Sequence, residues 1–94
     1  MATVRFGGFE WGEGKARENA QKHAVSFEEA MTAFADPLAV TAPDLYEPGR
    51  MVTIGMSVRG RVLFIVHAER GSSIRIISAR KASRGQRRKY EEEE

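Results

Sequence analysis

The chain has 94 residues, of which 41% are hydrophobic and 30% charged, and it contains no cysteine. A chain of this length forms one small domain, so we expect a single domain over residues 1–94 with residues 91–94 as a flexible tail. The lack of cysteine excludes disulfides, thiolate catalysis and cysteine zinc sites. No apolar run approaches the roughly 18 residues of a membrane span, and the N-terminus lacks the layout of an export signal, so we expect a cytoplasmic protein without membrane contact.

The net charge of +2 conceals a strong division along the chain. Residues 1–47 carry four Lys and Arg against eight Asp and Glu, whereas residues 48–90 carry eleven Lys and Arg against Glu69 alone. Four glutamates then end the chain. A basic block of this size in a small protein indicates a polyanionic partner, and the alternative is a solvated basic face.

The N-terminal elements are a short strand and a helix. Val4 and Phe6 alternate with polar neighbours until two glycines interrupt them, which predicts a strand over residues 3–9. Residues 13–23 favour a helix by propensity, and its buried stripe is thin. We expect that stripe to be Ala16, Ala20 and His23.

A second helix has the clearest local signals. Ser26 and Glu29 have the spacing of a capping box, and Val25 can pack on Ala30 as a hydrophobic staple. Pro37 ends the helix because proline excludes helical geometry for the residue before it. The apolar stripe consists of Phe27, Ala30, Met31 and Phe34.

The rest of the chain is mainly strand. We expect a short strand at 38–41, an irregular loop at 42–50 and a final helix that Ser83 and Gln86 cap and that runs to about Tyr90. Between them lies a three-stranded antiparallel meander over 51–58, 61–68 and 72–80. Helices followed by strands indicate an α+β domain: an antiparallel sheet of three to five strands, with two N-terminal helices packed on it and a C-terminal helix.

Two-residue turns at Arg59-Gly60 and Arg70-Gly71 would fix the register of the meander. Ile65 then lies opposite both Ile54 and Ile76, and His67 lies opposite Val52 and Ile74. A one-residue slip in either turn would exchange the two faces of the sheet. The face expected to receive the helices carries Val52, Ile54, Met56, Leu63, Ile65, Ile74 and Ile76.

The end of the sheet is rich in arginine, whose planar fork suits bidentate contacts with phosphate. Nucleic acid or a very acidic protein is the expected partner, and the alternative is a solubilising helix with internal ion pairs. Six cations fall within ten residues: Arg80, Lys81, Arg84, Arg87, Arg88 and Lys89.

Four further residues are candidates for chemistry. Arg75 lies between two isoleucines, so it either stands on the open sheet face as a phosphate clamp or pairs with a carboxylate. His67 and Glu69 share one side of an extended strand, which permits a base with an orienting carboxylate, although a half-buried structural histidine is the alternative. His23 closes a helix, where a structural role is again the alternative.

No pattern indicates a metal or a cofactor. The two histidines lie far apart, and no carboxylate spacing selects a metal. The glycines match neither a phosphate loop nor a dinucleotide fold. We therefore expect no cofactor.

Several short motifs together resemble the BrnT toxins of bacterial type II toxin–antitoxin pairs. They cover residues 9–90 in the family's order, and their combination is specific although no single motif is. The motifs are Phe9-Glu10-Trp11, Lys15, Asn19, Lys22-His23, Ser26-Phe27-Glu28-Glu29-Ala30, Phe34-Ala35-Asp36-Pro37-Leu38, Ile54-Gly55, His67-Ala68-Glu69-Arg70-Gly71, Ile74-Arg75-Ile76-Ile77-Ser78-Ala79-Arg80 and Arg88-Lys89-Tyr90.

The resemblance implies a RelE-like fold and a metal-independent endoribonuclease that blocks translation. It implies a BrnA-like antitoxin partner, in a toxin–antitoxin hetero-oligomer that binds operator DNA. The alternatives are a non-catalytic module that binds RNA or DNA through its basic C-terminal segment and a pure interaction protein. Two departures from the family are Ala24, where glycine is frequent, and Gly85 within the last helix.

If the chain cuts RNA, the 2′-hydroxyl attacks the adjacent phosphate and arginines stabilise the resulting charge. Arg75 and Arg80 are the expected phosphate ligands. The general acid and base would come from His67, Glu69, Lys15, His23 or Tyr90. The expected RNA contacts are Arg61, Lys81, Arg84, Arg87, Arg88 and Tyr90.

Overall fold

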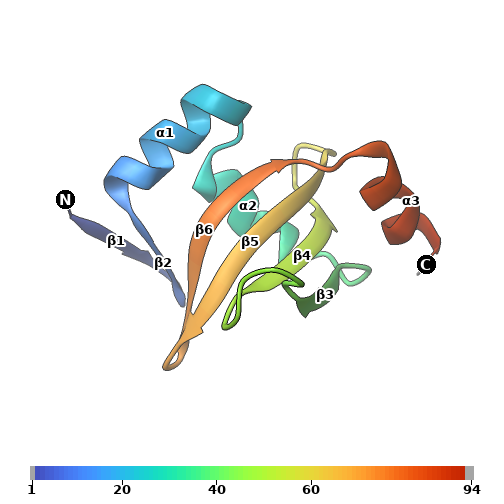
Figure 1. Cartoon of the computed structure of the whole chain (residues 1–94). Helices are drawn as coiled ribbons and strands as arrows, with labels where there is room; N and C mark the ends of the chain where they lie inside the picture. Colours follow the sequence, from blue (N-terminus) through green and yellow to red (C-terminus); the bar gives the residue numbers. More distant parts are fainter. Residues whose placement is uncertain (1, 93–94) are drawn as a thin grey trace.

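The computed structural model describes residues 2–92. Within that range the chain forms a twisted sheet with helices against it (Figure 1). The strands are β1 (Thr3–Phe6), β2 (Phe9–Gly12), β3 (Val40–Pro43), β4 (Met51–Met56), β5 (Val62–Arg70) and β6 (Ser73–Lys81). The helices are α1 (Glu13–His23), α2 (Phe27–Ala33) and α3 (Arg84–Glu92).

The sheet is six-stranded and mixed, with the order β1-β2-β6-β5-β4-β3. The α+β class is therefore right, but the expected antiparallel sheet of three to five strands is wrong, because β2 runs parallel to β6. The expected strand 3–9 is in fact the start of a hairpin, in which Phe6 pairs with Phe9. Gly7 and Gly8, both at positive φ, form its turn and bring β2 beside β6.

The register predicted for β4 and β5 is wrong by one residue. Ile54 lies opposite Phe64, not Ile65. The cause is a turn of three residues instead of two: the Ser57 amide donates to the Arg61 carbonyl across it, and Gly60 takes a φ of +77°. This one-residue shift reverses the two faces of β4. Val52, Ile54 and Met56, which were predicted to face the helices α1 and α2, therefore lie on the opposite side of the sheet.

The register predicted for β5 and β6 is also wrong, for two reasons. The turn residues are 71–72, since Arg70 pairs with Ser73. Ile77 is then an extra residue in β6: Val66 pairs with Ser78, but His67 pairs with Ile76. The bulge lets Ile76 and Ala79 both reach the helix side of the sheet, where they are buried.

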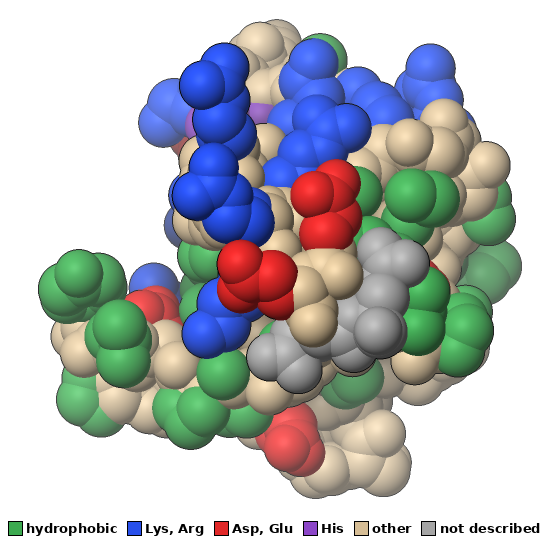
Figure 2. Space-filling view, turned by 90° about the vertical axis from the view of Figure 1, so that its right-hand side faces the viewer, with side chains coloured by type: hydrophobic (Ala, Val, Ile, Leu, Met, Phe, Trp, Pro, Cys, Tyr) green, Lys and Arg blue, Asp and Glu red, His purple; other side chains and the backbone are tan. Residues whose placement is uncertain are grey.

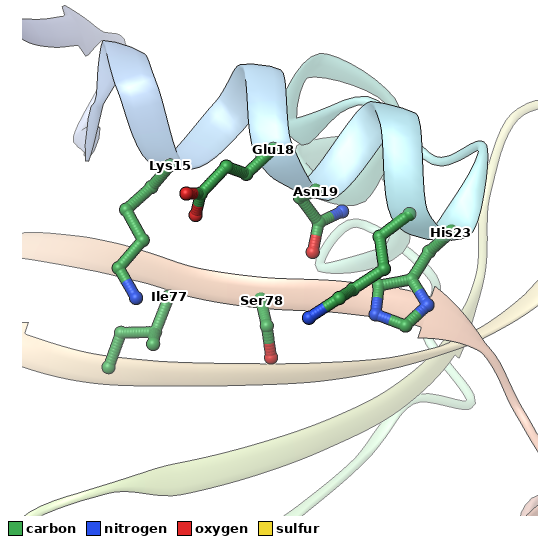
Figure 3. A pocket seen from close by; sticks show the side chains of 7 residues that line it. Lys15, Glu18, Asn19, His23, Ile77 and Ser78 are labelled. Atoms are coloured by element: carbon green, nitrogen blue, oxygen red, sulfur yellow. The ribbon is translucent and has the colours of Figure 1, made fainter.

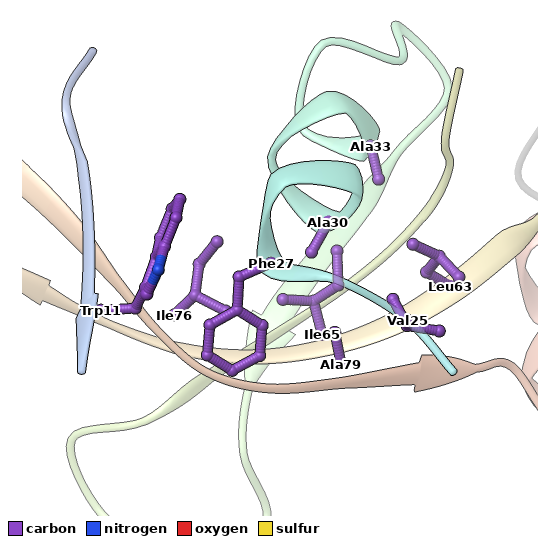
Figure 4. Packing of buried hydrophobic residues seen from close by; sticks show 9 residues of the cluster. All are labelled: Trp11, Val25, Phe27, Ala30, Ala33, Leu63, Ile65, Ile76 and Ala79. Atoms are coloured by element: carbon purple, nitrogen blue, oxygen red, sulfur yellow. The ribbon is translucent and has the colours of Figure 1, made fainter. Parts of the chain in front are cut away.

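Helices α1 and α2 pack on one face of the sheet, and Figure 4 shows the side chains of the main core between α2 and the strands. Ser26 caps α2 as predicted, accepting a hydrogen bond from the Glu29 amide at 3.0 Å. The predicted stripe of α2 is confirmed, since Phe27 and Ala30 are buried and Met31 and Phe34 pack against them. The buried core residues are Trp11, Val25, Phe27, Ala30, Ala33, Leu63, Ile65, Ile76 and Ala79.

Helix α1 spans the predicted residues, but the stripe expected for it is right only in part: Ala16 packs against the core and His23 is half-buried. Ala20 is exposed, and Asn19 is the buried residue of this helix. The Asn19 amide donates to the carbonyls of Val25 (2.9 Å) and Ala79 (2.8 Å), and its oxygen accepts from the Ala79 amide at 3.0 Å. Asn19 thereby supplies hydrogen-bond partners for backbone groups of β6 at a part of its edge that β2 does not reach.

Helix α3 packs on the other face of the sheet. The predicted cap is present, because the Gln86 amide donates to Ser83 Oγ and the Ser83 amide to Gln86 Oε1. Tyr90 is buried in a second cluster with Ile54 and Val62. The helix includes residues 91 and 92 of the expected tail, and residues 93–94 lie outside the described part.

None of the helices described here combines the length and apolar character that crossing a membrane requires.

Candidate functional site

A shallow pocket of about 120 Å³ lies where α1 crosses the free edge of β6 (Figure 3). Strand β2 pairs with β6 only through Phe9–Ile74 and Glu10–Arg75, so the later residues of β6 meet α1 instead. Figure 3 shows Lys15 reaching over β6 towards Ile77, and His23 at the opposite end of the pocket. We call this the α1–β6 pocket; it is lined by Lys15, Glu18, Asn19, Lys22, His23, Ile77 and Ser78.

Basic groups outnumber the one carboxylate in the α1–β6 pocket. Lys15 and Lys22 each bring an ammonium group, His23 an imidazole, and Glu18 the carboxylate. Histidine can accept and donate protons near neutral pH, and ammonium groups attract phosphate. The pocket therefore combines attraction for an anion with a group able to transfer a proton.

Arg75 adjoins this pocket and combines the two environments considered for it, the open sheet face and a carboxylate partner, while its role as a phosphate clamp stays a prediction. It lies on the sheet face opposite α2, and its Nη1 donates to Glu10 Oε2 at 2.9 Å. A β-carbon built on Gly12 would lie 3.6 Å from Arg75 Nη2 and 3.7 Å from Lys15 Cγ, so these two side chains flank Gly12. A guanidinium held in place thus lies next to the lysine of the pocket.

Arg80 is the second arginine fixed on this face of the sheet. Its guanidinium stacks on the Phe64 ring at 4.4 Å, and its Nη1 donates to Gln86 Oε1 at 3.0 Å. Figure 2, viewed from the side of α3, shows Lys and Arg side chains gathered over the upper part of the molecule with a histidine among them. The exposed cations near Arg80 are Lys81, Arg84, Arg87, Arg88 and Lys89.

His67 is buried in the helix-facing layer, with 4% of its surface exposed. Its Nε2 lies 2.7 Å from Thr53 Oγ1, and its Nδ1 has no hydrogen-bond partner among the described residues. Burial lowers the pKa of His67, and the negative charge of Glu69 opposes this only in part, so the ring is held neutral. The structure thus places His67 away from the α1–β6 pocket, and Glu69 is exposed near the end of β5.

Two other candidates from the sequence are built into the fold. Arg61 forms an ion pair with the buried Glu29 and donates to the Ala24 carbonyl at 3.0 Å, and this arginine lowers the pKa of Glu29. Tyr90 is buried, and its hydroxyl donates to Asp36 Oδ2 at 2.6 Å. Both side chains have partners within the fold, and their contact with RNA stays a prediction.

Glu10, Glu18, Lys22 and Ser78 were not among the site residues predicted from the sequence. One available signal was the spacing of Lys15, Glu18 and Lys22, which places them on one face of a helix. The pairing of Glu10 with Arg75 joins two strands 65 positions apart and leaves no local signal. Among residues 2–92, no three carboxylate or imidazole side chains form a group that could hold a metal ion.

Residues 11–86 match the family described as "Ribonuclease toxin, BrnT, of type II toxin-antitoxin system". The structure is also similar to the 1.1 Å crystal structure of the Brucella abortus ribonuclease toxin BrnT, with a TM-score of 0.65 and 25% sequence identity. That similarity covers 79% of this chain and 94% of the Brucella chain. None of the curated proteins matches the sequence.

Proposed function

Because this chain belongs to the BrnT family of ribonuclease toxins of type II toxin–antitoxin systems, we propose that it is a metal-independent endoribonuclease that blocks translation in the cytoplasm. The observation that supports this proposal is the position of Arg75, whose fixed guanidinium lies next to Lys15 at the end of the α1–β6 pocket. This arrangement supplies positive charge for a phosphate and, in Lys15 and His23, groups that can transfer protons.

The proposed reaction uses the 2′-hydroxyl of RNA as nucleophile. His23 accepts its proton while the 2′-oxygen bonds to the adjacent phosphorus, and the bond from phosphorus to the 5′-oxygen breaks. Lys15 donates a proton to that leaving oxygen, so the products carry a 2′,3′-cyclic phosphate and a 5′-hydroxyl. Arg75 and Arg80 stabilise the charge on the phosphorane, and the RNA continues across Arg84, Arg87 and Arg88.

The proposed protein partner is a BrnA-like antitoxin, in a hetero-oligomer that binds operator DNA. The surplus of cations on Lys81 and α3 supports this part of the proposal, since an acidic antitoxin segment would be attracted to the surface that RNA uses. Stoichiometric antitoxin should then suppress both RNA binding and cleavage.

The test is cleavage of a labelled single-stranded RNA by the purified chain with EDTA present throughout. We expect cleavage, and we expect Arg75→Ala and Arg80→Ala each to slow it by about 10²–10³-fold, the usual effect of losing one charge-stabilising donor. Arg17→Ala is the matched control, because Arg17 is an exposed cation of α1 that does not line the α1–β6 pocket.

Two results would contradict the proposal. Cleavage that needs an added divalent cation would remove the metal-independent mechanism. Intact RNA with salt-sensitive binding would favour the alternative, a non-catalytic module that binds nucleic acid through its basic C-terminal segment.

A further inference from the structure

A second group of arginines lies at the other end of the sheet, around the buried carboxylate of Glu10. The Glu10 side chain is only 9% exposed, and three strands supply its partners. Arg75 Nη1 on β6 lies 2.9 Å from Glu10 Oε2, Arg70 Nη1 on β5 lies 3.9 Å from the same oxygen, and Arg5 Nε on β1 lies 4.0 Å from Oε1. We call these four residues the Glu10 cluster.

The Glu10 cluster carries three positive charges against one negative charge. Only Arg75 makes a hydrogen bond to the carboxylate, whereas Arg70 and Arg5 stay at ionic distances with 60% and 75% of their side chains exposed. Their guanidinium donors are therefore available to a ligand from solvent. Arginine forks around a surplus of positive charge are suited to phosphate oxygens.

Glu10 also determines which part of Arg75 is available. It engages Nη1, while Nη2 lies towards Gly12 and Lys15 at the α1–β6 pocket. Without the carboxylate, three guanidinium groups would repel one another and Arg75 would lose this orientation.

We propose that the Glu10 cluster is an additional RNA-phosphate site, in which Arg5 and Arg70 bind a phosphate beyond the scissile one and Glu10 positions Arg75. This inference rests on the proposed function, because it takes RNA as the ligand. The competing explanation is structural: the cluster would only hold the β1–β2 hairpin against β6. Strands β2 and β6 pair at just two positions, so these ion pairs would strengthen a short contact. The two explanations differ in their dependence on salt.

The binding test uses a 2′-O-methylated single-stranded RNA, which cannot undergo attack by the 2′-oxygen, over a series of salt concentrations. Each phosphate contact on a single strand contributes about 0.7 to the slope of log K against log salt. We expect the slope to decrease by about 0.7 for Arg5→Gln and for Arg70→Gln, and to stay at the wild-type value for Arg17→Gln. Thermal melts confirm that each variant is folded, and wild-type slopes for folded Arg5→Gln and Arg70→Gln would overturn the proposal.

The positioning role of Glu10 is tested by the kinetics of Glu10→Gln. Loss of orientation should lower kcat by about tenfold to a hundredfold. KM should not rise, since a negative charge is removed from the RNA path, and Glu10→Asp should restore part of kcat. A variant that only melts at a lower temperature, with unchanged kcat, would make Glu10 purely structural.

Different results would contradict the proposed function and the proposed phosphate site. If the wild-type chain cuts no RNA, the proposed function is wrong. The salt slopes of Arg5→Gln and Arg70→Gln still decide whether the Glu10 cluster binds phosphate.

Discussion

Ala24 has a backbone conformation that suits glycine better than alanine. Among residues 2–92 it is the one non-glycine residue with a positive φ, +57°, and it ends α1 in the left-handed region. This conformation costs an L-residue about 1–2 kcal/mol, and the greater chain entropy of glycine offsets about 0.5–1 kcal/mol of that. We expect Ala24→Gly to raise the free energy of unfolding by about 0.5–1 kcal/mol in urea denaturation.

The control for Ala24 makes the same chemical change one turn earlier. Ala20 is exposed within α1 at ordinary helical geometry, so Ala20→Gly should lower the free energy of unfolding by about 1 kcal/mol. Equal destabilisation by both variants would show that the left-handed conformation of Ala24 carries no strain.

Single residues could be predicted from the sequence where their role is local. Ser26 and Ser83 cap helices as expected, because a cap depends on residues three positions away. For Arg75 the sequence indicated two possible environments but could not decide between them. Its carboxylate partner lies on a strand that was not expected to be its neighbour. The strand position of His67 beside Glu69 suggested a general base, but His67 is buried. The histidine that lines the pocket is His23.

At the scale of elements, α1 is held to the sheet by Asn19. Asn19→Ala would leave the amide and carbonyl of Ala79 and the carbonyl of Val25 without their side-chain partner. Each buried group left unsatisfied costs about 1–3 kcal/mol, so we expect a loss of at least about 3 kcal/mol in the free energy of unfolding. Gln21→Ala removes a similar amide from an exposed position on the same helix and should change stability by less than about 0.5 kcal/mol.

If Asn19→Ala changed the midpoint of urea unfolding no more than Gln21→Ala does, the anchoring role of Asn19 would be wrong. Faster exchange of the Ala79 amide hydrogen is a second, more local readout of the same bond.

The helices were predictable as elements, whereas the pairing of the strands was not. Helix limits follow from propensity and caps, and α1 spans the expected residues. Strand register instead depended on a three-residue turn at Gly60, which reverses the faces of β4, and on the bulge at Ile77, which shifts the later side chains of β6 to the other face. For that reason the sequence led to the wrong face of the sheet for Met56 while the list of strands was largely right.

For the whole molecule, His67 makes stability depend on pH. Burial lowers its pKa in the folded chain, while in the unfolded chain the imidazole titrates at its ordinary value of 6.5. Below that pH the unfolded state binds more protons, so the free energy of unfolding should fall as the pH decreases from 7 and level off once the folded-state pKa is passed. Urea denaturation at steps between pH 7.5 and about 5 measures this decrease.

The variant His67→Gln checks the source of this pH dependence. Glutamine can still bond to Thr53 but does not titrate, so its stability should be nearly flat over the same range. If the free energy of unfolding of His67→Gln decreased with pH as steeply as that of the wild-type chain, a group other than His67 would cause the pH dependence. Glu29 and Asp36 also have lowered pKa values, but their stabilising effect is lost only at pH values below their ordinary pKa values of 4.5 and 3.8.

The parallel pairing of β2 with β6 also has a consequence for biosynthesis. The ribosome completes the β1–β2 hairpin and α1 early, but the strand that they pair with is made after residue 72. Lys15 and Arg75 therefore come together only after β6 has been translated. A nascent chain that ends before β6 carries the lysines without the arginine, so the order of synthesis delays the assembly of the proposed site until β6 is made.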